Sequence, residues 1–488
     1  MLIAFCITAL AALTGVLFFR HRSASPSPHQ KSVALVVLGD IGRSPRMLYH
    51  AQSFASAGYR TAIVAYRGSS PPRELAENPN VQFVYLATPL PFASGLPRPL
   101  FLLLAPFKVL LGACGLLYAL MGRLDSLPRC LFVQNPPAIP TLPVVQLVAL
   151  LRGTRVIIDW HNTGYSVLAL RLGVEHKVVR IARFIEHFFG RTAYAHLCVS
   201  DAMKSQLTRE AGLRGHILTL HDRPPSSFHR LSPSESSDLF SRLDFLSPSA
   251  LNFPTSSASA SSTTVDHPLA PGLLDPTSPD RPALLVSATS WTQDEDFSIL
   301  LRALSKFETA ARAAAAVGGN DKRLPRVVVV ITGKGAGRAA FEREVEQLEK
   351  GWDWVRVRTA WLAREDYPRL LGAADLGISL HTSTSGIDLP MKVVDMFGCG
   401  LPVLALDFAC LPELVKDRKN GRIFRDADEM AEQLMDLLPT LSAPYPNALA
   451  LLRQGITTTR YGAPVNPKGG EEWSTWEENW ERVVGGVL

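Results

Sequence analysis

The stretch from His381 to Val403 holds the densest group of residues that could bind a phosphorylated ligand. A loop rich in small hydroxyl residues runs into a predicted helix, whose free N–H groups and dipole favour an anion such as a diphosphate. Lys392 and Asp395 share one helical face, so the cation could meet phosphate while the carboxylate takes ribose hydroxyls. The candidate donor-binding residues of this block are Ser385, Gly386, Asp388, Lys392 and Asp395.

A second glycine-rich turn, Thr332-Gly333-Lys334-Gly335, follows another apolar run. Glycines there would let a planar base or a phosphate approach the backbone, and Lys334 would add positive charge. A tight turn without any ligand is the alternative, because such turns are common in α/β proteins. Gly333 and Lys334 join the candidate donor-binding residues.

The turn from Gly39 to Arg46 is rich in polar residues. Its spacing is not that of a dinucleotide-binding G-x-G-x-x-G motif. Simple capping would explain Asp40 or Ser44 alone, but two arginines beside them favour a ligand site. Asp40 is a candidate catalytic base, and the candidate phosphate- or acceptor-binding residues are Arg43, Ser44 and Arg46.

The stretch from Asp159 to Tyr165 places Asp, His and Asn among aromatic residues. It offers a base, hydrogen-bonding groups and a surface on which a sugar could stack. As catalytic base, His161 ranks about equal to Asp40, and Asp159 ranks third. Asn162 and Tyr165 are further candidate acceptor-binding residues.

Short apolar runs that alternate with helix-like stretches must position these loops, a pattern typical of parallel sheets. The runs fall at 33–38, 61–65, 81–86, 130–133, 156–158, 197–199 and 217–220, and then at 283–287, 327–331, 355–358, 376–380, 402–406 and 422–424. Each polar loop follows such a run, at the sheet edge where ligands bind. The 488 residues also suffice for two cores. The predicted fold is α/β with two Rossmann-like domains facing across a cleft.

The N-terminus, residues 1–22, is predicted to be a transmembrane anchor. The first 19 residues carry no charge, and Arg20, His21 and Arg22 follow at once. That length spans a bilayer core. A cleaved signal peptide carries its positive charge before the apolar run, so the anchor is favoured and the bulk of the chain is placed in the cytosol.

Composition divides the remaining chain into further segments. Residues 31–222 and 282–440 are the two predicted Rossmann-like domains. The apolar stretch 99–122, interrupted by Pro106 and Lys108, is either a buried core helix or a helix in the bilayer. Residues 231–281, rich in Ser and Pro, are predicted to be a disordered insertion. In the tail 441–488, Trp473, Trp476 and Trp480 share a helical face that would pack on the N-terminal domain.

Charge and cysteine usage exclude several classes of protein. The formal net charge of +6 comes without a long basic run, which argues against a nucleic-acid partner. The six cysteines include no C-x-x-C pair, so neither a zinc cluster nor a disulfide framework is indicated. No D-x-D type metal site is evident, and no metal-binding residues are assigned.

Several motifs together resemble GT-B glycosyltransferases. The block from His381 to Val403 resembles their nucleotide-sugar motif. More narrowly, Gln134-Asn135-Pro136-Pro137, Asp159-Trp160-His161-Asn162 and Gly386-Ile387-Asp388-Leu389-Pro390-Met391-Lys392 resemble the chitobiosyldiphosphodolichol β-mannosyltransferase family. The resemblance covers roughly residues 33–424 apart from the Ser-rich segment. Many retaining GT-B enzymes carry an acid eight positions before the position of Asp395, where this chain has Ile387. An inverting route is therefore expected.

This resemblance implies an enzyme that transfers mannose from GDP-mannose in β-1,4 linkage to a chitobiose diphosphate on dolichol. It also implies that residues 31–222 form the acceptor-binding domain and that residues 282–440 form the nucleotide-sugar-binding domain. It implies an endoplasmic reticulum membrane location with the catalytic domains in the cytosol, contact with the bilayer, and other transferases of the pathway as candidate partners. No tightly bound cofactor is expected, and dependence on a divalent metal stays open. The alternatives are a membrane-bound GT-B transferase with another sugar or lipid acceptor, and a non-catalytic scaffold of a transferase complex.

Overall fold

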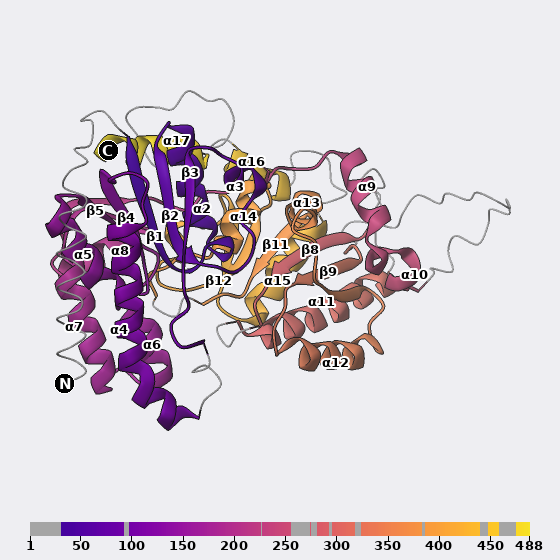
Figure 1. Ribbon diagram of the computed structural model, residues 1–488. Helices are drawn as coiled ribbons and strands as arrows, with labels where there is room; N and C mark the ends of the chain where they lie inside the picture. Colours follow the sequence, from indigo (N-terminus) through magenta and orange to yellow (C-terminus); the bar gives the residue numbers. More distant parts are fainter. Residues whose placement is uncertain are drawn as a thin grey trace. The chain divides into compact units, whose positions relative to one another are not determined.

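The computed structural model describes residues 31–91, 97–225, 227–254, 274, 281–291, 295–317, 324–382, 386–439, 448–457 and 475–488. The predicted anchor at residues 1–22 lies outside the described residues, as do Ser385 and Trp473. The chain divides into two compact units, Met1–Asp222 with Glu477–Leu488, and Arg223–Trp476. Figure 1 labels helices and strands of both units.

The N-terminal unit is built on a seven-stranded sheet in the order β3-β2-β1-β4-β5-β6-β7. All neighbouring strands are parallel. The strands are β1 (Ser32–Asp40), β2 (Arg60–Tyr66), β3 (Val81–Leu86), β4 (Cys130–Asn135), β5 (Arg155–Trp160), β6 (Thr192–Cys198) and β7 (Arg214–Thr219). Each coincides with or overlaps a predicted apolar run, so the Rossmann-like prediction is confirmed for this half.

Helices connect these strands and cover the sheet (Figure 1). They are α2 (Pro45–Ser56), α3 (Arg73–Ala76), α4 (Arg98–Gly122), α5 (Thr141–Arg152), α6 (Gly164–Leu172), α7 (Lys177–Gly190) and α8 (Asp201–Glu210). A short 3-10 helix, η1 (Ile41–Arg43), precedes α2. Pro45 stands at the first position of α2, where its missing N–H costs no hydrogen bond.

Helix α4 runs without interruption through Pro106 and Lys108, two residues that we expected to break it. Its last turns are core, with Leu116, Leu120 and Met121 buried. Earlier positions of the helix, among them Phe107 and Leu111, are exposed. By length and composition alone, Leu104–Gly122 could cross a membrane. The buried-helix alternative therefore holds only for the carboxyl end of α4.

The C-terminal unit contains a six-stranded parallel sheet in the order β10-β9-β8-β11-β12-β13. Its strands are β8 (Ala283–Ala288), β9 (Val327–Thr332), β10 (Val355–Ala360), β11 (Leu376–Ser379), β12 (Val403–Leu406) and β13 (Gly421–Phe424). Alternate residues of these strands pack into two different hydrophobic cores. Leu285 and Val329 pack in one, and Leu284 and Val328 pack in the other. This half also confirms the predicted Rossmann-like domain.

Helices cover both faces of this second sheet. They are α9 (Pro233–Arg242), α10 (Pro248–Leu251), α11 (Phe297–Val317), α12 (Arg338–Glu349), α13 (Asp366–Ala373), α14 (Met391–Gly398), α15 (Ala427–Leu437) and α16 (Ala448–Thr457). Phe307 of α11 and Leu434 of α15 are buried in one core. Leu239 of α9 and Phe397 of α14 are buried in the other core.

The prediction of a disordered insertion at residues 231–281 is wrong for residues 231–254. Helix α9 begins with a capping box, in which Ser232 and Glu235 satisfy each other's backbone N–H groups. Its residue Leu239 is buried, and Leu251 of α10 is buried as well. The average composition of the segment hid these apolar positions. Residues 255–273 and 275–280 lie outside the described residues.

The tail 441–488 contains two separate helices rather than one element. Helix α16 belongs to the C-terminal unit, whereas Glu477–Leu488, which includes most of α17 (Trp476–Val483), belongs to the N-terminal unit. Trp480 packs edge-on against Phe54 of α2, with ring centroids 5.1 Å apart. The chain therefore returns to its first domain at its end.

Candidate active site

Asp40 ties two loops of the N-terminal sheet together. Its carboxylate accepts hydrogen bonds from the Gly42 N–H at 3.0 Å and from the Ser69 N–H and hydroxyl at 2.9 Å. Burial raises the pKa of Asp40, but the hydrogen bonds from Ser69 and Gly42 outweigh it and lower the pKa. A carboxylate held in this way is a weak proton acceptor. Gly42 is required because a Cβ there would lie 2.5 Å from the Ser69 carbonyl oxygen.

Arg43 and Ser44 complete this turn. Arg43 is 81% exposed and lies 3.6 Å from the Asp40 carboxylate, while its Nε donates to the Ser69 hydroxyl at 3.3 Å. The Ser44 hydroxyl donates to the backbone carbonyl of Asp40 at 3.2 Å. Arg43 is thus the cation of this loop that a ligand could reach, whereas Ser44 serves the turn itself.

Arg46 joins the ends of three chain segments inside the N-terminal domain. Its guanidinium donates two parallel hydrogen bonds to Asp159, at 2.9 and 2.8 Å. It donates two more from Nη1, to the Leu220 carbonyl at 2.9 Å and to Asp222 at 2.8 Å. Arg46 and Asp159 are both buried. We predicted that Arg46 contacts phosphate or acceptor, and its burial instead makes it the partner of Asp159.

Asp159 is the buried anion at the end of β5. Burial raises its pKa, but the adjacent Arg46 guanidinium, more than the two neighbouring imidazoles, holds the pKa well below its usual range. Its carboxylate has no exposed surface. The geometry therefore fits a positioning group for its neighbours better than the proton acceptor for which we ranked it third.

His161 projects from the same strand end and is partly exposed, with 23% of its side chain accessible. Its Nε2 lies 2.7 Å from Asp159 Oδ2. Because an ionised carboxylate only accepts hydrogen bonds, Nε2 carries the proton and Nδ1 keeps a lone pair. An imidazolium formed at His161 would be stabilised by the adjacent anion. This is the arrangement of a histidine base with an orienting carboxylate.

A second histidine, His50 of α2, reaches the same carboxylate from the other side. Its Nε2 lies 3.2 Å from Asp159 Oδ2, and its Nδ1 accepts the indole N–H of Trp480 at 3.0 Å. Burial lowers the pKa of His50 to about 4, so this ring is neutral at physiological pH. The C-terminal helix is therefore connected through His50 to the candidate base. Neither His50 nor Trp480 could be placed here from sequence, because 430 positions separate them.

Asn162 and Tyr165 flank the N-terminus of α6, which is held by a buried acid that we did not predict. Glu186 of α7 accepts the N–H groups of Gly164 at 2.9 Å and Tyr165 at 3.0 Å, and the side-chain amide of Asn135 at 2.6 Å. Burial raises its pKa. The Asn162 carbonyl oxygen Oδ1 accepts the Thr163 N–H at 2.7 Å. The Tyr165 ring lies edge-on to His187, with centroids 5.4 Å apart.

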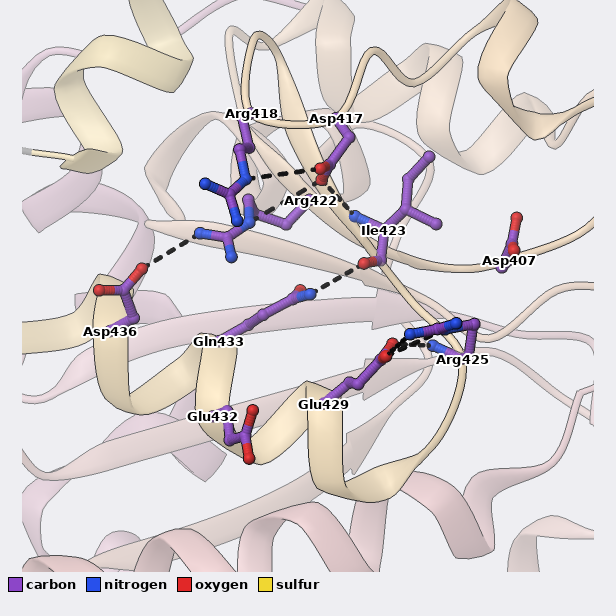
Figure 2. A pocket seen from close by; sticks show the side chains of 10 residues that line it. All are labelled: Asp407, Asp417, Arg418, Arg422, Ile423, Arg425, Glu429, Glu432, Gln433 and Asp436. Carbon is purple, nitrogen blue, oxygen red and sulfur yellow. Dashed lines mark hydrogen bonds and ion pairs between the residues drawn. The ribbon is translucent and has the colours of Figure 1, made fainter.

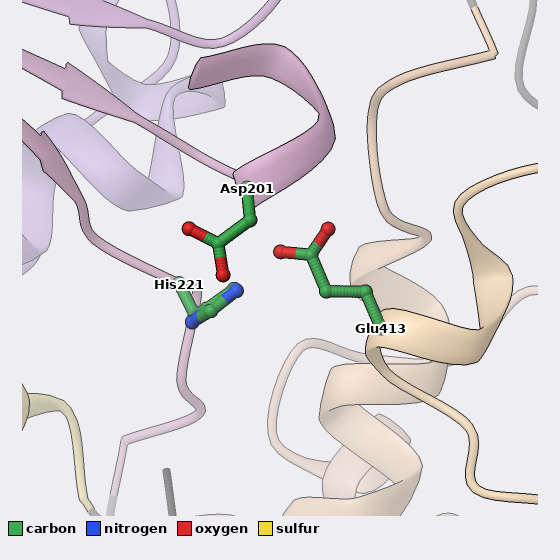
Figure 3. Close-up of side chains that lie close together, drawn as sticks. All are labelled: Asp201, His221 and Glu413. Atoms are coloured by element: carbon green, nitrogen blue, oxygen red, sulfur yellow. The ribbon is translucent and has the colours of Figure 1, made fainter. Parts of the chain in front are cut away.

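Asp201 and His221 lie at the ends of the next two strands of this edge (Figure 3). Asp201 begins α8, and its carboxylate accepts the Thr219 hydroxyl. The backbone carbonyl of His221 accepts the side-chain amide of Asn479 at 3.0 Å. The third side chain drawn, Glu413, belongs to the C-terminal unit. Polar groups thus follow β1, β5, β6 and β7 along one sheet edge, as parallel strands require.

In the C-terminal domain, Lys392 at the start of α14 is bonded to Glu295, at 2.5 Å. Glu295 is buried, and its other oxygen accepts the Thr289 hydroxyl at 2.6 Å and the Ser290 N–H at 3.3 Å. Lys392 keeps a quarter of its side chain exposed. The cation is thus fixed at the carboxyl end of β8. Glu295 was missed because it lies 97 positions from Lys392 and belongs to no motif.

The glycine-rich turn after β9 packs against the loop after β8. A Cβ on Gly333 would lie 1.8 Å from the Thr289 carbonyl oxygen, and the φ of Gly333 is +149°. The Trp291 indole N–H donates to the Gly333 carbonyl at 3.3 Å. Lys334 Nζ lies 4.3 Å from the ring centroid of Trp361, which is 60% exposed. An exposed indole with a neighbouring cation is a platform for a planar base, and Trp361 was missed as a single aromatic residue.

The remaining residues of the predicted donor block surround α14. The Tyr367 hydroxyl donates to Asp395 at 3.2 Å. The Asp388 carbonyl accepts the Cys410 thiol at 3.3 Å. Gly386 has a φ of +75°, a conformation that favours glycine. Lys392 and Asp395 are both partly buried on α14.

A polar hollow near β13 in the same domain is poorly suited to a nucleotide (Figure 2). Five carboxylates and three guanidinium groups line it, and most are paired with one another. Arg422 Nη1 bonds to Asp436 at 3.1 Å, and Arg425 bonds to Glu429. The excess of carboxylates would repel a diphosphate. The cationic and aromatic groups at the ends of β8, β9 and β10 are better suited.

Two Rossmann-like domains, one with a histidine–carboxylate pair and one with a cation at a helix N-terminus, define a GT-B glycosyltransferase. Family models agree: residues 42–223 match "Glycosyl transferase 4-like domain", and residues 285–439 match "Glycosyl transferases group 1". The chain belongs to the chitobiosyldiphosphodolichol β-mannosyltransferase family.

Two relatives and one solved structure illustrate the range of similarity. The human chitobiosyldiphosphodolichol β-mannosyltransferase is 41% identical over 456 residues, covering 93% of this chain and 92% of its own. A protein of Arabidopsis thaliana named UDP-glycosyltransferase TURAN is 40% identical over 422 residues, covering 83% and 88%. A glycosyltransferase from Rickettsia africae shares the fold at 10% identity, with a TM-score of 0.57 and coverage of 94% and 98%.

Proposed function

We propose that this protein transfers mannose from GDP-mannose to chitobiose linked through a diphosphate to dolichol, in β-1,4 linkage and with inversion. The observation that carries this proposal is the pairing of His161 with the buried Asp159, in a chain 41% identical to a relative named for this activity. The pair supplies a base on a strand end of the N-terminal domain. The C-terminal domain supplies cationic and aromatic groups for a nucleotide.

The base acts on the acceptor hydroxyl. Nδ1 of His161 takes the proton of the 4-hydroxyl of the outer N-acetylglucosamine as that oxygen attacks the anomeric carbon of mannose. The bond from this carbon to the phosphate oxygen breaks, and its electron pair leaves with GDP. Asp159 holds the imidazole in the required tautomer and faces the positive charge that forms. No hydrogen bond from a described residue reaches Nδ1 of His161.

The donor is held by the C-terminal domain. The N-terminus of α14 and Lys392 stabilise the charge that grows on the leaving diphosphate. Glu295 keeps Lys392 in place and prevents it from extending into solvent. The guanine ring stacks on the exposed face of Trp361, beside Lys334. These groups can replace a divalent cation, so we propose that transfer proceeds without one, and activity retained in excess EDTA would support this.

The acceptor is a lipid, so the reaction takes place at a membrane surface. We propose the cytosolic face of the endoplasmic reticulum as its location, with residues 1–22 as anchor. Helix α4 supports a second contact with the bilayer, because it is long and apolar and exposes Phe107 and Leu111. Other transferases of the same pathway are the expected protein partners.

Transfer of labelled mannose from GDP-mannose to chitobiose diphosphate dolichol, with UDP-sugars as controls, tests the proposal. His161→Ala should lower kcat by about 10²- to 10⁴-fold, the range for loss of a general base. Asp40→Asn should retain more activity than His161→Ala, because Asp40 only connects two loops through its hydrogen bonds with Gly42 and Ser69. Absence of transfer from any nucleotide sugar would refute the enzymatic function, and full activity of His161→Ala would refute the assigned base.

A second donor has one specific observation in its favour. The Arabidopsis relative is named a UDP-glycosyltransferase although it is 40% identical to this chain. Stacking on Trp361 does not by itself discriminate guanine from uracil. If labelled sugar is transferred from a UDP-sugar and none from GDP-mannose, the donor proposed above is wrong, while the base and the fold of the site are unaffected.

A further inference from the structure

Helices α6 and α7 form a hairpin that exposes an apolar surface on the N-terminal domain. We propose that this surface inserts into the interfacial region of a bilayer that contains anionic lipids. The hairpin face, as we call it, consists of six exposed apolar residues. They are Leu170, Val174, Val178, Ile181, Phe184 and Phe188.

This face does not pack on the domain. Helix α7 packs on the domain through Val179, Glu186 and Gly190, which are its buried residues. Ile181, Phe184 and Phe188 follow at i, i+3 and i+7, which places them together on an exposed side of the helix. Phe184 is 67% exposed, and its ring stacks on Phe188 at 5.8 Å rather than on the core. Helix α7 therefore has a buried face that packs on the domain and a separate apolar face that stays exposed.

Charge on the hairpin identifies the occupant of this face. Arg171, Lys177 and Arg180 are exposed, and none of them forms an ion pair within the described part of the chain. Glu175 is the one exposed carboxylate between residues 164 and 190, because Glu186 is buried. Basic residues beside an apolar stripe are the pattern of a helix that lies in a membrane interface, where each cation meets anionic headgroups.

Continuity with α4 supports a bilayer rather than a second protein chain. Helices α4 and α5 pack together, α5 packs on α7, and α7 on α6, so that one helical layer carries all these surfaces (Figure 1). Helix α4 is the described helix long and apolar enough to cross a membrane. Glu186 of α7 also holds the N-terminus of α6, three residues after His161. A hairpin docked on lipid would therefore keep the candidate base near the surface from which a lipid-linked acceptor arrives.

A fluorescence experiment on the full chain in liposomes tests this inference. An environment-sensitive dye is attached at Phe184→Cys, and in a matched control at Ser205→Cys on α8, an exposed position of the same domain. Because Cys114 is a partly accessible free cysteine, the signal of the dye-treated unsubstituted chain is subtracted from the signal of each variant. With 30% phosphatidylserine in phosphatidylcholine, shallow doxyl-labelled lipid should quench the dye at position 184 at least threefold more than at 205. In phosphatidylcholine alone, quenching at 184 should fall.

Removal of the cations separates the contribution of charge from that of apolar contact. The triple variant Arg171→Gln, Lys177→Gln, Arg180→Gln should weaken docking on anionic liposomes about fivefold for each cation removed. Equal quenching at 184 and 205 would overturn the inference, as would quenching at 184 that does not depend on anionic lipid. A blue shift without lipid that grows with protein concentration would assign the face to a second copy instead. Sugar transfer is not part of the readout, so failure here leaves the proposed activity untouched.

Discussion

Removing Arg46 should destabilise the N-terminal domain and disable His161 at the same time. In Arg46→Met, the Asp159 carboxylate loses two hydrogen bonds at 2.8 and 2.9 Å and its full countercharge, while it remains buried beside two imidazoles. Breaking a buried ion pair by removing one partner costs about 3–5 kcal/mol. That is a large part of the roughly 5–15 kcal/mol that stabilises a domain. We therefore expect Arg46→Met to populate partly unfolded molecules.

The double variant Arg46→Met, Asp159→Leu isolates the interaction. Asp159→Leu alone leaves Arg46 buried with Asp222 as its remaining carboxylate partner, and should cost a similar amount. The double variant removes both charges of the buried pair, and Asp222, which is partly exposed, loses Arg46 in the single Arg46→Met variant as well. The loss in the double variant should therefore be smaller than the sum of the single losses by about 2 kcal/mol or more. The two variants that lack Asp159 should transfer sugar slowly, since His161 has lost the carboxylate that orients it. Arg46→Met should also be slow, because the Asp159 carboxylate has lost the guanidinium that holds it. Recovered stability without recovered activity would mark Asp159 as a positioning residue.

The pH dependence of Arg46→Met provides a further check. In the unsubstituted protein, Arg46 depresses the pKa of Asp159, so its contribution is present above about pH 4 and is lost only below that value. Without Arg46, burial raises the pKa, and the folded state gains stability by binding a proton as pH falls. The deficit of the variant should therefore shrink between pH 7 and pH 5.

Hydrogen exchange resolved by peptide measures these losses domain by domain, because a chain of two domains does not unfold in a single step. Peptides from α2 and β5 report on the N-terminal domain, and peptides from β9 serve as the internal control. If the two single losses add to within about 0.5 kcal/mol in the double variant, Arg46 and Asp159 are not coupled, and the reasoning is refuted.

Four further results are expected. His196 of β6 is buried and accepts the Trp160 indole N–H at 3.2 Å, and burial lowers its pKa to about 4. This residue alone should therefore lower the stability of the domain by roughly 2 kcal/mol as pH falls from 6.5 to 5, and His196→Gln should reduce that slope in hydrogen exchange. Trp361→Ala should raise the KM for the donor about tenfold and leave kcat and stability nearly unchanged, whereas an unchanged KM would exclude stacking. Lys392→Met should lower both kcat and the stability of the C-terminal domain, since Glu295 remains buried, and Lys392→Arg serves as its control. Leu239→Ala should cost the C-terminal domain about 2–5 kcal/mol in denaturant titrations, and a negligible loss would contradict the packing of α9.

The sequence was sufficient to predict both sheets, because parallel strands buried on two faces are continuous apolar runs with little ambiguity. Runs such as 33–38 and 327–331 correspond closely to β1 and β9. The prediction failed at residues 231–254, where the abundance of Ser and Pro concealed a helix. There Ser232, Pro233 and Glu235 are start signals for α9, and Leu239 is the buried position that anchors it. Local capping chemistry was more informative than average composition.

The candidate residues were found more easily than their roles. Asp40, Asp159 and His161 all stand at strand ends, and residue type alone ranked them as comparable bases. Their environments separate them: Asp40 accepts three hydrogen bonds within its loop pair, Asp159 is buried against Arg46, and the His161 side chain is partly exposed. The contacts of Ser69 with Asp40 and of Arg46 with Asp159 span 29 and 113 positions, which a local motif does not encode.

The buried charges around Asp159 explain why a histidine, and not a carboxylate, should carry the proton. Arg46 bears one positive charge, while Asp159 and Asp222 bear two negative charges, and the ring of His50 stays neutral because burial opposes its protonation. A positive charge that forms on His161 during transfer would face the Asp159 carboxylate at 2.7 Å. Trp480 contributes to this arrangement, since its N–H occupies Nδ1 of His50 and directs the Nε2 proton toward Asp159. Helix α17 thus holds His50 in the tautomer that faces Asp159, the carboxylate beside the proposed base His161.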